Sequence, residues 1–266
     1  MVRYDTNNSI HQENTMSLPE YTVASACDRD DIMDKSDIVV DRVWPTFMLK
    51  DPVANNNWND LFEYFPDFQF ALFDNETDEV LAAANSIAFH FDGSPESLPD
   101  EGCDWVVQKG IRDAREGRAP NYQSALQIVI APEYAGTGLS YTAVKLMKEI
   151  GRSRGLPAMV APVRPNAKPQ YPLAAMDDYI RWTNGDGLPF DPWMRVHVRL
   201  GARICKVCPR AMHIEGTIAD WEEWTGMRFP QSDRYVVPGA LLPVTIDCEA
   251  DRGVYIEPNV WMCHEL

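Results

Sequence analysis

The chain has 266 residues, with 24 Lys and Arg against 40 Asp and Glu, which gives a formal net charge of −16. This surplus of carboxylates repels phosphate backbones and anionic membrane surfaces, so we expect neither nucleic acid nor membrane as a partner. No stretch is long and apolar enough to span a bilayer, and the first residues lack the apolar segment of a signal peptide. The sequence therefore predicts a globular cytoplasmic protein.

Residues 1–20 are polar and aperiodic, which predicts an N-terminal arm without fixed structure, and residues 21–266 are expected to form a single domain. The six cysteines are scattered, so free thiols are expected. Cys205 and Cys208, followed by His213, have a spacing that occurs in zinc sites. They fall in a predicted strand, whose alternation turns the two thiols to opposite faces, so no metal is predicted.

The first half of the chain predicts two helices and then a hairpin. Apolar residues recur at helical spacing from residue 36 until Pro45 interrupts them, and residues 58–64 form a second, short amphipathic segment. Residues 68–74 and 80–89 are strand-like and are joined by a short polar turn, which is typical of a β-hairpin. A helix is predicted over residues 105–118.

The middle of the chain predicts a strand at residues 124–131, a glycine-containing turn, a helix at 141–154 and a strand at 157–163. A strand–helix–strand unit of this kind forces a parallel crossover, so the fold class is α/β with a mixed sheet. An aromatic and proline-rich insertion follows at about 167–191. Beyond it we expect a helix at 192–200, a strand at 203–207, a helical turn at 220–225 and strands near 240–246 and 253–264.

The turn Gly136-Thr137-Gly138 leads directly into the helix at 141–154. A strand that passes through glycines into a helix directs free backbone N–H groups and the positive end of the helix dipole at one point, which suits a phosphate. The alternative is that the glycines only shape a tight turn. The segment is not a Walker loop, and Tyr141 stands where a dinucleotide fingerprint would have its third glycine.

At this junction the chain resembles the GNAT superfamily of acyl-CoA-dependent acyltransferases. The family signature is Arg/Gln-x-x-Gly-x-Gly/Ala, and here it reads Glu133-Tyr-Ala-Gly136-Thr-Gly138. The order of elements matches over about residues 68–207. The resemblance implies a GNAT fold, with a central mixed sheet flanked by helices and a βαβ cofactor-binding unit. Two departures stand out: Glu133 replaces the cationic or amide residue, and the insertion has no counterpart in standard members.

The resemblance also implies the cofactor and its site. It implies acetyl-CoA or another acyl-CoA as the acyl donor, and acyl-phosphopantetheine on an acyl carrier protein is the alternative donor. Backbone N–H groups near residues 128–130 would polarise the thioester. The turn would hold the pyrophosphate, and Lys168 would add positive charge beside it. The expected cofactor-binding residues are Ile128, Val129, Ile130, Tyr134, Ala135, Gly136, Thr137, Gly138, Leu139, Ser140, Asn166 and Lys168.

The catalytic candidates are His197, Asp191 and Glu257. His197 stands where the family has a Tyr that protonates the departing thiolate, and an imidazole titrates near neutrality. The alternative is a packed histidine. Asp191 and Glu257 are candidate bases that would deprotonate the amine, although Asp191 precedes Pro192 and also suits a helix N-cap.

The expected function is transfer of an acyl group, acetyl by expectation, from acyl-CoA to the amine of a small-molecule acceptor. Two alternatives stay open. One is a GNAT-like acyl-thioester decarboxylase or S-acyltransferase that acts on CoA or carrier-protein thioesters, and the other is a non-catalytic CoA-binding module. The aromatic residues of the insertion would line a pocket or pack into the core. Both a monomer and a homodimer are compatible with the sequence.

Overall fold

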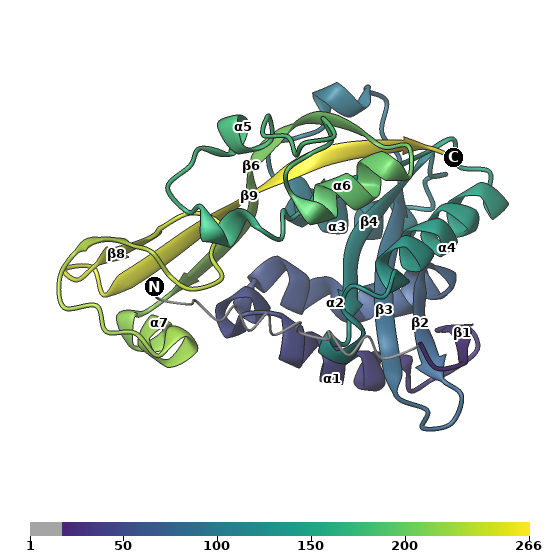
Figure 1. Ribbon diagram of the computed structural model, residues 1–266, viewed down its shortest axis with the longest axis horizontal. Helices are drawn as coiled ribbons and strands as arrows, with labels where there is room; N and C mark the ends of the chain where they lie inside the picture. Colours follow the sequence, from purple (N-terminus) through teal and green to yellow (C-terminus); the bar gives the residue numbers. More distant parts are fainter. Residues whose placement is uncertain (1–17) are drawn as a thin grey trace, which may run out of the picture.

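A computed structural model describes residues 18–266 of the chain (Figure 1). The predicted arm at residues 1–20 therefore lies almost entirely outside the described residues. Across the described range, no helix has the length and apolar character needed to cross a membrane.

A 9-stranded mixed sheet, counted over residues 18–266, forms the centre of the fold. The parallel pair is β4 (Tyr122–Ile130) with β5 (Ala158–Val163), and the other pairs described are antiparallel. The mixed sheet predicted from the strand–helix–strand unit is thus confirmed. The remaining strands are β1 (Tyr21–Ser25), β2 (Gln69–Asp74), β3 (Val80–Phe89), β6 (Arg203–Gly216), β7 (Asp233–Tyr235), β8 (Val244–Asp247) and β9 (Arg252–Glu265).

The helices lie close to where hydrophobic periodicity places them. The long predicted helices are confirmed with ends shifted by a few residues, because caps rather than apolar spacing decide where a helix begins. The helices of the described residues are α1 (Ile32–Val43), α2 (Pro52–Tyr64), α3 (Gly102–Arg115), α4 (Leu139–Ser153), α5 (Met176–Tyr179), α6 (Pro192–Arg199) and α7 (Ile218–Thr225). The short helix α5 lies in the insertion and was not predicted. Asp51 caps α2 by accepting a hydrogen bond from the Ala54 N–H, which explains why this helix starts well before residue 58.

Strand alternation divides the buried residues of the sheet between two layers. Ala71, Ala83 and Val129 contact the core beneath α1, whereas Leu72 and Ala82 contact the core beneath α4. Figure 1 shows α1 and α2 on one side of these strands and α4 on the other. Both faces are covered, so β2 and β3 are buried along their whole length.

The strands β6 and β9 are longer than predicted and extend beyond the rest of the sheet (Figure 1). With β7, β8 and α7 they form an arm that has its own apolar core around Trp221 and Tyr255. Irregularities in the β6–β9 register near Cys205 and between Cys208 and Met212 bend the pair. The short segment predicted at residues 203–207 is therefore only the beginning of β6.

The aromatic rings of the insertion pack on one another. Tyr171 lies 5.1 Å from Trp182 and 5.6 Å from Phe190 between ring centroids, both edge to face. Tyr179 is 1% exposed and joins the same cluster. Because the rings contact each other and the core beneath α4, they fill space rather than line an open pocket. The core-packing interpretation of the insertion is thus the one that the structure favours.

A carboxyl pair, the buried Asp51 and the half-buried Asp104, joins α2 to α3 beside the arm formed by β6–β9 and α7. Burial, followed by the charge of Asp51, raises the pKa of Asp104 to about 8. The folded protein therefore holds a proton that the unfolded chain releases near pH 4, so the free energy of unfolding falls as the pH rises from about 4 to 8. Asp104→Asn removes this charge, and we expect it to raise the free energy of unfolding at pH 9 by at least about 1 kcal/mol.

Urea titrations of both proteins at pH 6 and pH 9 measure the effect of Asp104→Asn. The difference in the free energy of unfolding between Asp104→Asn and the wild type is expected to be smaller at pH 6 than at pH 9. Equal pH dependence in the two proteins would show that Asp104 does not carry the bound proton.

Candidate active site

The parallel pair β4–β5 separates soon after it begins. The two strands are paired at Gln123–Met159 and Ser124–Val160, and the described pairing stops there. On its other edge β4 stays paired with β3 as far as Ile130, with Leu126 as an extra residue where the register shifts. This bulge kinks β4 just after Ser124, the last residue of β4 that pairs with β5. A gap therefore opens between the carboxyl ends of β4 and β5.

The gap exposes backbone groups of β4 that have no strand beside them. The N–H of Ala131 donates to the Leu81 carbonyl on β3 at 2.9 Å. Because N–H directions alternate along a strand, Val129 also points its N–H toward β3, and Ile128 and Ile130 point theirs into the gap. Of the three expected thioester contacts, the backbone direction suits Ile128 and Ile130 and not Val129.

The glycine turn lies at the end of β4, where it leads into α4. Gly136 and Gly138 have φ values of 80° and 92°, in the left-handed region where glycine is favoured, and Gly138 is the N-cap of α4. No atom lies within 4 Å of where a Cβ would stand on either glycine, so the space above the turn is open. The N–H groups of Leu139 and Ser140 begin the helix and have no acceptor inside it.

The other expected cofactor residues lie in the turn itself or beyond the end of β5. Thr137 donates its hydroxyl to the Tyr134 carbonyl at 2.6 Å, which closes the loop. Ala135 is exposed, and the Leu139 side chain is buried under α4, so only its backbone faces the turn. Asn166 is exposed beyond the end of β5.

Glu133 points away from the turn. Its carboxylate forms an ion pair with Arg42 of α1, at a groove of about 300 Å³ between α1 and β3. The pKa of Glu133 is lowered, first by a hydrogen bond from its own backbone N–H and then by Arg42. Arg42 therefore neutralises the charge of Glu133 outside the turn, where this carboxylate repels a bound anion least.

His197, on α6, is 1% exposed and its Nδ1 lies 2.9 Å from Nε2 of His264 on β9. Burial, together with the neighbouring His264, lowers the pKa of His197 to about 3. The expectation that this imidazole titrates near neutrality is wrong, because the charged form would be buried without an opposite charge. At neutral pH His197 is therefore a neutral imidazole.

Asp191 is a structural cap and not a free base. One of its oxygens accepts from the N–H groups of Trp193 and Met194, and the other accepts from the Ala167 N–H and the Tyr179 hydroxyl. With both oxygens engaged and 1% exposure, it holds the start of α6 against the insertion. The structure contradicts its assignment as a catalytic base.

Glu257 is enclosed in an ion pair and is also unsuited to act as a base. Its oxygens lie 3.0 and 2.9 Å from Nε of Arg164, and they accept further hydrogen bonds from Tyr255 and Asn259. Both oxygens of the buried carboxylate are therefore engaged, and neither is free to take a proton from an amine. Its role is to fix Arg164 at the end of β5, where the guanidinium also stacks over Trp44 at 5.4 Å.

Lys168 does not face a cofactor. Its ammonium is fully buried and donates to the carbonyls of Tyr171 and Leu241, and burial lowers its pKa to about 8. The cation therefore ties the insertion to the loop before β8, which corrects its expected role at the phosphates. Other cations near α4 are engaged as well, since Arg154 pairs with Asp67 and Arg152 with Glu149.

Sequence reasoning missed His264, Trp44 and Gln127 as site residues. Trp44 donates from its indole to the Gln127 side chain of β4 at 3.0 Å, which connects the end of α1 to the gap. Only the fold brings these residues together, because they are distant along the chain. His264 carried one local signal, because it directly follows the apolar run of residues 260–263.

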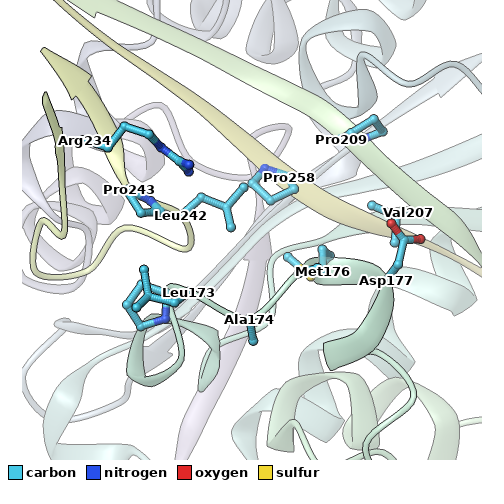
Figure 2. Close-up of a pocket in the computed structure, with 12 residues that line it drawn as sticks. Leu173, Ala174, Met176, Asp177, Val207, Pro209, Arg234, Leu242, Pro243 and Pro258 are labelled. Atoms are coloured by element: carbon cyan, nitrogen blue, oxygen red, sulfur yellow. The ribbon is translucent and has the colours of Figure 1, made fainter.

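A groove of about 390 Å³ lies between the insertion, β6 and β9 (Figure 2). Leu173 and Met176 line one side of it, and Val207 and Pro258 line the other. Arg234 and Asp177 are its charged residues. The groove shares no residue with the glycine turn or the histidine pair, so we assign the candidate active site to the gap between β4 and β5.

Replacing Arg164 by Met tests the ion pair that supports the end of β5. A buried Glu257 without its partner costs about 3–5 kcal/mol, so Arg164→Met is expected to lower the free energy of unfolding by this amount. Adding Glu257→Gln removes the unpaired charge and is expected to recover a large part of the loss. Denaturant midpoints of the single and double variants measure both effects, and a double variant no more stable than Arg164→Met contradicts the pairing.

No protein-family model matches the chain. It is 27% identical to the arginine N-acetyltransferase avaD of Aspergillus versicolor over 93% of this chain and 95% of the relative. Among solved structures, the loading GNATL domain of CurA from Lyngbya majuscula superposes with a TM-score of 0.57 and 19% identity, covering 92% of this chain and 98% of that domain. The GNAT-like decarboxylase GphF, solved with isobutyryl-CoA, superposes with a TM-score of 0.57 and 13% identity, covering 92% of this chain and 98% of that chain. The separated β4–β5 pair, the glycine turn and these full-length similarities show that the chain has the fold of GNAT proteins.

Proposed function

We propose that the protein transfers an acyl group from an acyl-CoA to the amine of a small acceptor. The observation that carries the proposal is the continuous path from the gap between β4 and β5 to the glycine turn at the N-terminus of α4. A thioester needs a narrow slot with N–H donors, and a pyrophosphate needs a cluster of free amides. In this proposal the free edge of β4 would serve the thioester, and the turn between β4 and α4 would serve the pyrophosphate.

In the proposed complex, the backbone would bind the cofactor at two places, the turn before α4 and the free edge of β4. In this proposal the amides of Gly136, Gly138, Leu139 and Ser140 would hold the pyrophosphate, whereas the Thr137 N–H already donates to the Tyr134 carbonyl at 3.3 Å. An acidic chain would then bind a polyphosphate without a cluster of free cations. The N–H groups of Ile128 and Ile130 point into the gap, where one of them would stabilise the developing oxyanion of the thioester carbonyl. His197 is the candidate that returns a proton to the departing sulfur.

The acceptor is proposed to enter as the free amine. Asp191 and Glu257 have no oxygen available to take its proton, so we assign this proton to water at the open end of the gap. The similarity to an arginine N-acetyltransferase makes arginine the first acceptor to test. The identity of the acyl group is open, and acetyl is the simplest choice.

Thioester decarboxylation is the second candidate reaction. It is supported by the similarity to the GNAT-like decarboxylase and to a loading domain, which share this chain's architecture over nearly its full length. Loss of carbon dioxide from a malonyl-type thioester uses the same thioester slot and needs no acceptor amine. The two reactions can therefore be separated by leaving the amine out.

Binding of CoA is expected to raise the melting temperature. At a ligand concentration of 100 Kd the stabilisation is about 2.7 kcal/mol, which corresponds to a shift of several degrees. Gly138→Asp should abolish the shift, because a carboxylate and a Cβ then occupy the turn. Gly117→Asp is the matched control, since Gly117 also has positive φ, at 65°, and open space around its Cβ. Equal shifts in both variants would contradict the site, and no shift in the wild type would favour loss of CoA binding.

Mass spectrometry of reaction mixtures distinguishes the two reactions. With acetyl-CoA and a panel of amines that includes arginine, we expect a gain of one acetyl group on the amine and release of free CoA. Malonyl-CoA without an amine should stay intact if acyl transfer is the activity. Conversion of malonyl-CoA to acetyl-CoA, with no acylated amine in any mixture, would replace acyl transfer by decarboxylation.

A further inference from the structure

The interior between α6, α4 and β9 holds two histidines in direct contact. Nδ1 of His197 and Nε2 of His264 are 2.9 Å apart, and the two side chains are 1% and 0% exposed. The ring of Trp193 packs edge to face against His197 at 4.4 Å. The pair is therefore held in one geometry by α6 on one side and β9 on the other.

Each histidine has a second ring nitrogen that is buried and without a partner. Among the described residues, Nε2 of His197 and Nδ1 of His264 have no hydrogen-bond partner. A buried polar atom left unpaired costs about 1–3 kcal/mol, so two such atoms in one cluster are unfavourable for packing alone. The two free nitrogens lie at opposite ends of the pair, as they do in a chain of donors and acceptors.

The hydrogen bond between the rings has two equivalent forms. In one, His264 donates from Nε2 and His197 carries its own proton on Nε2. In the other, His197 donates from Nδ1 to Nε2 of His264. Nδ1 of His264 then carries a proton, and Nε2 of His197 carries none. Passing between the forms moves one proton through the pair while both rings stay neutral at the start and at the end.

The electrostatics of the surroundings favour neutral rings. Burial is the main cause that lowers the pKa of both histidines, to about 3 for His197 and about 4 for His264. Lys148 on α4 is the charged group that acts on His264, and it donates to the Leu200 carbonyl beside the pair at 3.0 Å. A single histidine in this position would be a weak proton source, because it is not protonated near neutral pH.

We propose that His197 and His264 form a neutral proton relay that supplies the departing thiolate, and this inference rests on the proposed acyl transfer. When the C–S bond breaks, its electron pair goes to sulfur, which takes the proton from Nε2 of His197. Nδ1 of His197 takes the proton from Nε2 of His264 in turn. Nδ1 of His264 then takes up a proton from solvent, so that both rings end neutral. His264 is thus a positioning and relay residue that does not touch the substrate.

The relay is tested by comparing leaving groups. His264→Gln can still donate to Nδ1 of His197 and hold the ring, but it cannot pass a proton on. With the acetyl thioester of N-acetylcysteamine, whose thiol is weakly acidic, kcat is expected to fall by about 10²-fold. With the acetyl thioester of 4-nitrothiophenol, which leaves without a proton, kcat should stay close to that of the wild type. His213→Gln, on the exposed part of β6, is the matched control and should leave both rates unchanged.

The outcomes separate the relay from its alternatives. Equal loss with both thioesters would assign His264 a purely structural role, and no loss with either would remove it from the reaction. Wild-type turnover in mixtures of light and heavy water gives a check that needs no variant, because a relay predicts a curved dependence on the deuterium fraction and a single proton transfer predicts a straight line. A wild type that acylates no amine would overturn the proposed function and the relay together.

Discussion

The early end of hydrogen bonding between β4 and β5 is the constraint on which the rest of the molecule depends. Two paired positions hold the strands together, and the bulge at Leu126 then turns β4 away from its neighbour. A continuous parallel ladder would satisfy more backbone groups, so the gap is unfavourable unless something else occupies it. Other contacts stabilise β5 in place of the missing ladder. Every residue of β5 pairs with β9, and Glu257 fixes Arg164 at the end of β5.

Charge is distributed so that an acidic chain keeps one site free of repulsion. The net charge of −16 suggests a protein that avoids anions, and Lys168, the cation expected near the site, is engaged elsewhere. The site instead uses backbone amides, whose partial charges are fixed by the helix and the glycines and are independent of composition. Glu133 fits this arrangement because Arg42 draws its carboxylate toward α1.

The sequence predicted the parts of the fold that depend on local pattern. The β-hairpin, the strand–glycine–helix unit and the long helices followed from periodicity and turn residues, since these properties are contained in a few neighbouring positions. It could not predict that Asp191 and Lys168 are buried and fully bonded, because their partners, such as Ala167 N–H and the Leu241 carbonyl, are supplied by loops distant in sequence. The same holds for β1, a short edge strand that forms only where β2 offers its edge.

The histidine pair shows how burial can change the chemistry that a residue type suggests. His197 was selected for the near-neutral pKa of imidazole, a property that the interior removes. Burial leaves the other property of imidazole, a donor and an acceptor on opposite sides of one ring. A single ring of this kind can exchange one proton for another without becoming charged, provided that a partner meets its inner nitrogen. His264 meets it at 2.9 Å, so the low dielectric that excludes imidazolium is the condition under which a neutral relay is favoured.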